Sequence, residues 1–181
     1  MTAHISSCSD ASVRSHDGRP RSAGVAVQTC LSIFQGSEIR VLPVASRMFH
    51  IPVTDIDVAE RIGVLAGAYM IRCKADLILA IIKEERCVLE PSISLYTDRQ
   101  CLLQTLPRCS AFKVLCDRLI NQFGLEQQTG VLLLWERRES NFMQGIDRKS
   151  CCRYKNDGVS HEHAVSPGLS HSSYQESHIL E

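Results

Sequence analysis

The sequence predicts an α/β domain in which a mixed β-sheet is flanked by helices. Apolar residues in the middle of the chain alternate between strand-like and helix-like spacing, which is typical of layered α/β folds. The chain has 181 residues, of which 44% are hydrophobic, and this is enough for one core of ordinary size. Its formal net charge is zero, whereas tight nucleic-acid binders are usually basic. Composition therefore favours a single α/β domain and argues against tight nucleic-acid affinity.

Composition divides the chain into three parts. Residues 1–47 are rich in Ser, Thr, Gly, Arg and His and are expected to hold little stable structure. Residues 48–149 carry the alternating apolar pattern and form the predicted domain. Residues 150–181 contain few apolar side chains, which cannot offset the entropy lost on ordering. This C-terminal tail is therefore predicted to be disordered.

Seven elements are expected within residues 48–149, each from a run of apolar or β-favouring residues bounded by polar ones. In chain order they are strands at 49–54 and 63–71, a helix at 76–86, a strand at 93–97, helices at 101–106 and 112–123, and a strand at 131–135.

Two carboxylates stand out at the centre of this pattern. Asp76 opens the expected helix 76–86, where a negative charge complements the helix dipole. Asp98 directly follows the strand that begins near Ile93, and open α/β sheets carry their chemistry at the carboxyl ends of strands. Because hard divalent cations prefer oxygen ligands, Asp76 and Asp98 are a candidate metal site.

These residues resemble the ribonuclease H domain that follows the reverse transcriptase of non-LTR retrotransposons. In that family a helix opening Ala-Glu-Leu-x-Ala-Ile precedes a strand ending Tyr-Thr-Asp-Ser-Gln-x-x-Leu. This chain has Ala-Asp-Leu-Ile-Leu-Ala-Ile at 75–81 and Tyr-Thr-Asp-Arg-Gln-Cys-Leu-Leu at 96–103. A helix from Ser110 and an apolar strand ending in Trp135 follow in the family's order. The resemblance implies a partial ribonuclease H-like fold with a mixed sheet and flanking helices.

The resemblance also implies two further metal-binding carboxylates. Asp55 corresponds to the one that ends the family's first strand, and Asp17 and Glu38 remain alternatives to it. Asp147 is the nearest counterpart of the family's last one. Only 21 positions separate Asp55 from Asp76, too few for the family's three-stranded meander, so one strand is expected to be missing.

The chain also departs from the family after Trp135. The family continues Val-Pro-Gly-His, a loop whose His assists product release, but residues 136–139 are Glu-Arg-Arg-Glu. The loop His is therefore missing. With one strand expected to be lost as well, the resemblance implies an impaired enzyme or a remnant.

The implied function is hydrolysis of the RNA strand of RNA–DNA hybrids by two-metal catalysis. Mg²⁺ or Mn²⁺ would be held by Asp55, Asp76, Asp98 and Asp147. The expected partner is an RNA–DNA hybrid, with no small-molecule cofactor. Two alternatives remain open: a non-catalytic α/β interaction module, and a relic protein without evolved function.

Cysteine usage and hydropathy indicate where the chain resides. It has nine cysteines, an odd number without the Cys-x-x-Cys spacing of zinc sites, so reduced thiols are expected. The first residues lack a secretory signal, and the apolar runs are too short to span a bilayer. A cytoplasmic or nuclear location without a membrane partner is therefore expected.

Overall fold

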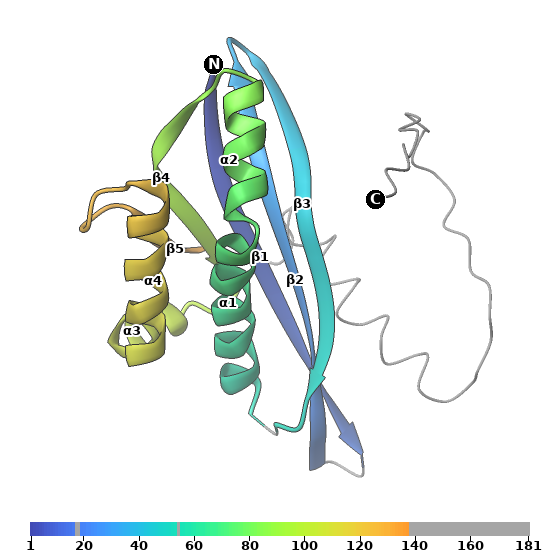
Figure 1. Cartoon of the computed structure of the whole chain (residues 1–181). Helices are drawn as coiled ribbons and strands as arrows, with labels where there is room; N and C mark the ends of the chain where they lie inside the picture. Colours follow the sequence, from blue (N-terminus) through green and yellow to red (C-terminus); the bar gives the residue numbers. More distant parts are fainter. Residues whose placement is uncertain (17–18, 54, 138–181) are drawn as a thin grey trace, which may run out of the picture.

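The computed structural model describes residues 1–16, 19–53 and 55–137. The strands in this part of the chain belong to one sheet (Figure 1). They are β1 (Thr2–His16), β2 (Arg19–Gln35), β3 (Glu38–Ile51), β4 (Val88–Thr97) and β5 (Val131–Trp135). The strand order is β3-β2-β1-β4-β5. β1, β2 and β3 form an antiparallel meander, while β4 runs parallel to both β1 and β5.

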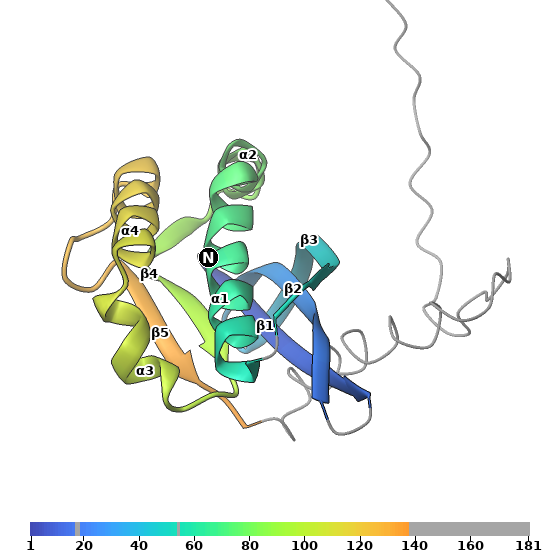
Figure 2. The ribbon, with the colours of Figure 1, turned by 90° about the horizontal axis from the view of Figure 1, so that it is seen from below.

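Helices make the two crossovers that parallel pairing requires. The elements between β3 and β4 are α1 (Ile56–Cys73) and α2 (Ala75–Glu84), and those between β4 and β5 are α3 (Leu102–Thr105), the 3₁₀ turn η1 (Leu106–Arg108) and α4 (Ser110–Phe123). Figure 2 shows α1 and α4 side by side on one face of the sheet. This arrangement confirms the predicted α/β fold with a mixed sheet and flanking helices.

Residues 1–47, which the sequence analysis places outside the domain, form β1, β2 and most of β3. Some of their small polar side chains bond between strands: the Ser7 hydroxyl donates to the Gln28 carbonyl oxygen (3.2 Å), and Thr29 Oγ1 donates to Ser7 Oγ (3.3 Å). Low hydrophobicity here therefore reflects a closely packed sheet rather than an absence of structure. The three-stranded meander is complete, so the strand expected to be missing is present.

The prediction of a strand at residues 63–71 is wrong, because these residues lie within α1. Gly63 and Gly67 are one helical turn apart and face β1. A Cβ at Gly67 would lie 2.6 Å from Ser7 Oγ, and one at Gly63 would lie 3.0 Å from Ser9 Cβ. The two glycines therefore allow α1 to approach β1 closely.

The main core lies between the sheet and the helices. Its fully buried large apolar side chains include Ile5 and Leu31 of the meander, Ile71 of α1, Ile78 of α2, Ile93 and Leu95 of β4, Leu102 and Leu106 after β4, and Leu119 of α4. Burying each such side chain stabilises the fold by roughly 1.5–3 kcal/mol. The core therefore fixes α1 and β4 relative to β1.

The later elements follow the sequence-based expectations. Helices over 75–84 and 110–123 and strands over 88–97 and 131–135 match the predicted types, with ends shifted by a few residues. None of the helices in the described ranges is long and apolar enough to cross a membrane. The predicted disordered tail, residues 150–181, lies outside the described residues.

Candidate metal centre

Three carboxylates from distant parts of the sequence meet beside the end of β4. They belong to Asp10 in β1, Glu60 in α1 and Asp98 directly after β4. Each offers one oxygen, and these three oxygens lie within 4.8 Å of one another. Asp10 is 1% exposed and Glu60 is 0% exposed, while Asp98 is half-buried. The structure thus concentrates negative charge in one largely buried place.

Parallel pairing of β1 and β4 places Asp10 next to Asp98. The last aligned pair of the two strands is Cys8 with Tyr96, and two residues further along each strand are Asp10 and Asp98. β4 ends at Thr97, whose Oγ1 accepts a hydrogen bond from the Arg99 amide (3.1 Å). The turn after β4 therefore begins where β1 continues, and both carboxylates lie at that point.

The neighbouring strand also holds this turn. The indole N–H of Trp135, the last residue of β5, donates to the Asp98 carbonyl oxygen (3.1 Å). The amide of the next residue, Glu136, donates to the Thr97 carbonyl oxygen (3.0 Å). The backbone of Asp98 is thereby fixed by β5 as well as by β4.

Glu60 reaches the group because α1 begins close to the sheet. Asp55 is the N-cap of α1, and its Oδ1 accepts from the amides of Asp57 (2.7 Å) and Val58 (3.4 Å), a standard way to satisfy the first helical N–H groups. Glu60 Oε1 accepts from the Ala11 amide at 3.0 Å. The Glu60 side chain is therefore tied to the residue of β1 that follows Asp10.

The energetics of this arrangement indicate what it can bind. Two unit charges 4.8 Å apart repel by roughly 3.5 kcal/mol at an effective dielectric constant of about 20. Burial adds a desolvation cost to each charge. A hard divalent cation offsets both costs, and Mg²⁺ and Mn²⁺ prefer carboxylate oxygens. The donor set therefore fits such a cation, and the three carboxylates form an acidic triad.

The structure places the four site residues expected from sequence in different environments. Asp98 belongs to the triad. Asp55 is exposed and caps α1, and Asp76 is exposed in the first turn of α2, so neither belongs to the triad. Asp147 lies outside the described residues. The expectation for Asp76 took the helix that it opens to carry a ligand beside Asp98, whereas the helical carboxylate in the triad is Glu60 of α1.

The structure does not place the alternatives for the upstream ligand in the triad either. Glu38 is exposed at the start of β3 and lies outside the triad, and Asp17 is not among the described residues. Asp10 and Glu60 were missed by the sequence analysis. The usable signal was in α1, where the buried residues Glu60, Val64 and Ile71 recur at helical spacing.

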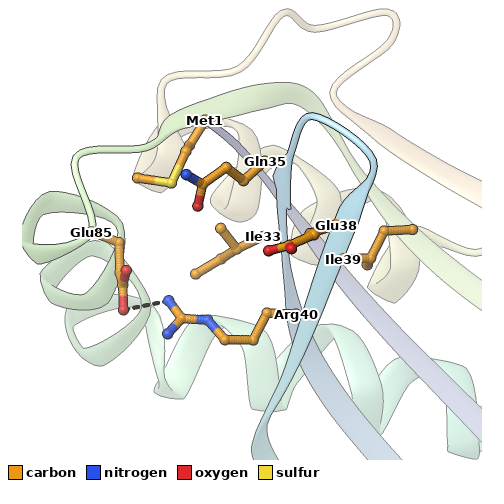
Figure 3. Close-up of a pocket in the computed structure, with 7 residues that line it drawn as sticks. All are labelled: Met1, Ile33, Gln35, Glu38, Ile39, Arg40 and Glu85. Carbon is orange, nitrogen blue, oxygen red and sulfur yellow. Dashed lines mark ion pairs between the residues drawn. The ribbon is translucent and has the colours of Figure 1, made fainter.

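A separate hollow of about 500 Å³ lies at the other end of the sheet, and Figure 3 shows its lining. It is lined by Met1, Ile33, Gln35, Glu38, Ile39, Arg40 and Glu85. Arg40 Nη2 and Glu85 Oε1 form an ion pair of 2.5 Å across it. Met1 directly precedes β1, and Asp10 lies nine positions further along, which in a strand corresponds to roughly 30 Å. The hollow is therefore remote from the acidic triad.

Comparisons with known proteins add likenesses to solved structures. No family model matches the chain, and no curated protein matches its sequence. LC9-RNase H1, described as a type 1 RNase H with the type 2 active-site motif, is 11% identical with a TM-score of 0.49, covering 84% of this chain and 72% of that one. LC11-RNase H1, isolated from compost by a metagenomic approach, is 12% identical with a TM-score of 0.46, covering 84% and 99%.

Foamy-virus structures are similar to the same degree. The PFV RNase H domain is 12% identical with a TM-score of 0.46, covering 84% of this chain and 94% of that one. The foamy viral protease-reverse transcriptase in complex with an RNA/DNA hybrid is 10% identical with a TM-score of 0.46, covering 81% and 19%. Identities this low carry no information about activity.

Proposed function

We propose that this chain is a ribonuclease H-type nuclease domain that hydrolyses the RNA strand of RNA–DNA hybrids, with Asp10, Glu60 and Asp98 holding Mg²⁺ or Mn²⁺. The observation that carries the proposal is the convergence of these carboxylates within 4.8 Å, two of them fully buried. Buried carboxylates gathered in this way repel one another, so their burial is best explained by a cation.

The residues of the chain have separate tasks in this proposal. A bound divalent cation would activate a water molecule and stabilise the leaving oxygen during in-line attack on a phosphodiester. Glu60 keeps its position through the Ala11 amide (3.0 Å), so its carboxylate is oriented before substrate binds. Trp135 holds the backbone of Asp98 (3.1 Å). Such preorganisation lowers the cost of reaching the transition state.

Asp147 remains our proposal for a fourth ligand. The sequence resemblance is its only support, since it lies beyond residue 137. Asp55 and Asp76, expected as ligands from sequence, are replaced in this proposal by Asp10 and Glu60.

We also infer descent from the ribonuclease H domain of a non-LTR retrotransposon. The motif Tyr-Thr-Asp at 96–98 spans the end of β4 and contributes Asp98 to the acidic triad, and the Trp at the end of β5 donates to the Asp98 carbonyl oxygen. Both agree with the resemblance seen in the sequence. The complete meander removes one of the reasons to expect an impaired enzyme. The replacement of the loop His by residues 136–139 still favours slow product release.

A hybrid-cleavage assay tests the function. The RNA strand of an RNA–DNA hybrid is labelled, and its cleavage is followed with Mg²⁺ and with Mn²⁺. We expect cleavage by the parent chain and a loss of at least about 100-fold in Glu60→Gln and Asp98→Asn, because electrostatic stabilisation of this kind supplies several kcal/mol. Asp76→Asn is the matched control, since it neutralises an exposed carboxylate outside the triad, and it should cleave normally.

Two results would contradict this proposal. One is a parent chain that folds but cleaves no hybrid with either metal, which would favour the non-catalytic interaction module. The other is cleavage that is unchanged by Glu60→Gln. A parent chain without cooperative unfolding would favour a relic without evolved function.

A further inference from the structure

An ion pair lies at the rim of the acidic triad. Arg99 directly follows Asp98, and its Nη2 lies 3.0 Å from Oδ1 of Asp57 in the first turn of α1. The Arg99 side chain is 37% exposed and that of Asp57 is 48% exposed. Both groups are therefore open to solvent, unlike the carboxylates of Asp10 and Glu60.

The helix geometry places this ion pair beside the triad. Asp57 and Glu60 are three positions apart in α1, and residues at that spacing lie on the same side of a helix. The Arg99 guanidinium contacts Asp57 and therefore lies over the first turn of α1. It is thus held about one helical turn from a carboxylate of the triad.

The carboxylates in this region explain why a positively charged side chain is useful there. Asp57 adds a fourth carboxylate next to Asp10, Glu60 and Asp98. Nucleic-acid substrates are polyanions, and a cluster of carboxylates repels them. Arg99 neutralises Asp57 and places a positive charge directly at the edge of the proposed cleavage site.

The ion pair with Asp57 does not satisfy all the hydrogen-bond donors of Arg99. A guanidinium carries five N–H donors in a rigid fork that matches phosphate geometry. Among the described residues, Nε of Arg99 is buried and has no hydrogen-bond partner, which costs roughly 1–3 kcal/mol. The exposed end of the fork can still donate charge-assisted hydrogen bonds to a phosphate.

We propose that Arg99 binds a backbone phosphate of the nucleic-acid substrate beside the reacting phosphodiester, and that Asp57 is the partner that the guanidinium exchanges for this phosphate. This inference rests on the proposed nuclease function and names a substrate contact of that same site. The motif of the resembling family has Ser at the position of Arg99, so the contact belongs to this chain's own sequence.

The test measures hybrid binding as a function of salt. The dissociation constant of the full chain for an RNA–DNA hybrid is determined between 50 and 200 mM salt, with Ca²⁺ in place of Mg²⁺ to slow cleavage. Each phosphate contact contributes roughly 0.7–0.9 to the slope of log K against log salt concentration. Arg99→Gln should lower this slope by about that amount and weaken binding by about tenfold at 50 mM salt.

Asp57→Asn separates the two possible roles of the ion pair. It removes the competing carboxylate and keeps the Arg99 charge, so a phosphate contact predicts binding as tight as the parent's or tighter. A contact that only fastens β4 to α1 predicts that Asp57→Asn and Arg99→Gln weaken binding equally. Arg40→Gln is the matched control, because it breaks a similar Arg–Glu pair remote from the triad, and it should leave the slope unchanged.

Arg99→Lys keeps the test decisive even where Arg99→Gln does not fold. It retains the charge but not the fork, so the salt slope should remain within about 0.3 of the parent's. The inference is overturned by an unchanged slope in Arg99→Gln, by a lost slope in Arg99→Lys, or by equal weakening in Asp57→Asn. Hybrid binding and cleavage by Arg99→Gln equal to the parent's would refute this inference alone, whereas a parent that binds neither Mn²⁺ nor hybrid would refute the proposed function with it.

Discussion

A backbone contact helps to orient Glu60 in the acidic triad. Its carboxylate is fully buried, and its Oε1 accepts from the Ala11 amide in β1. A buried carboxylate with a backbone donor retains its charge at a lower cost than one without. This contact also joins α1 to the strand that carries Asp10, so the position of one ligand is coupled to the position of another.

Cys116 offers a prediction at the same scale. Burial, with a contribution from the Asp117 charge, raises the pKa of its thiol to about 11. The thiolate is the reactive form, so alkylation of Cys116 at pH 8 should be about two orders of magnitude slower than that of an ordinary exposed cysteine with a pKa near 8.5. Its rate should rise about tenfold for each pH unit up to pH 10.

Mass spectrometry after timed alkylation of the folded chain measures these rates. Cys73 and Cys101 are exposed and serve as internal references. Equal rates at Cys116 and Cys73 at pH 8 would contradict the raised pKa.

Single residues of the site were predictable only where the sequence marks them. Asp98 ends a strand with a clear alternating pattern, and strand ends are where α/β sheets carry their chemistry. Asp10 lies within the 15-residue strand β1. Which residue of β1 joins the acidic triad depends on where the neighbouring strand β4 ends. That information is tertiary, so the residues around Asp10 do not contain it.

Elements with a strong apolar period were predictable, and those built from small residues were not. Strand β5 and helix α4 have large apolar side chains at the expected spacing. Helix α1 instead meets β1 through Gly63 and Gly67, and glycines in an apolar run resemble a strand or a turn as much as a helix. The close approach that requires the glycines also brings Glu60 to the site.

Gly67→Ala tests this close approach. The added methyl group would overlap Ser7 Oγ, which already bonds to β2. Overpacking costs about 1–3 kcal/mol, and the better helix propensity of Ala returns up to about 1 kcal/mol. We expect a net loss of about 1–2 kcal/mol in the free energy of unfolding, measured by urea denaturation, together with weaker Mn²⁺ binding as α1 moves away from β1.

Gly124→Ala is the control for this variant. Gly124 follows α4 with a φ of +66°, and a Cβ there would meet nothing within 4 Å. It should lose about 1 kcal/mol through its backbone conformation but retain normal Mn²⁺ binding. Unchanged stability and Mn²⁺ binding in Gly67→Ala would show that the helix does not need the glycine.

At the scale of the whole molecule, the first 47 residues are integral to the fold. They supply the centre of the sheet, buried side chains such as Ile5 and Leu31, and the ligand Asp10. Composition alone could not predict this, because small residues in β1 and β2 pack through their backbones and contribute little hydrophobicity. The order of the elements after residue 75 was predictable because each has its own apolar pattern.

Removal of residues 1–47 therefore has a definite expected result. The fragment 48–181 lacks β1, β2 and most of β3 and should show no cooperative thermal unfolding by circular dichroism, since its core has lost one side. The full chain, measured alongside, should unfold cooperatively. A fragment that unfolds with the same midpoint as the full chain would show that the first three strands do not contribute to the core.

The central claim is that Asp10, Glu60 and Asp98 form one divalent-metal site. Titration calorimetry of Mn²⁺ into the full chain and into Asp10→Asn measures this directly, with Asp76→Asn as control. We predict saturable binding by the parent and by Asp76→Asn, and in Asp10→Asn a loss beyond the roughly 10- to 100-fold caused by disturbing outer-shell partners. Mn²⁺ binding by Asp10→Asn as tight as by the parent would contradict the claim.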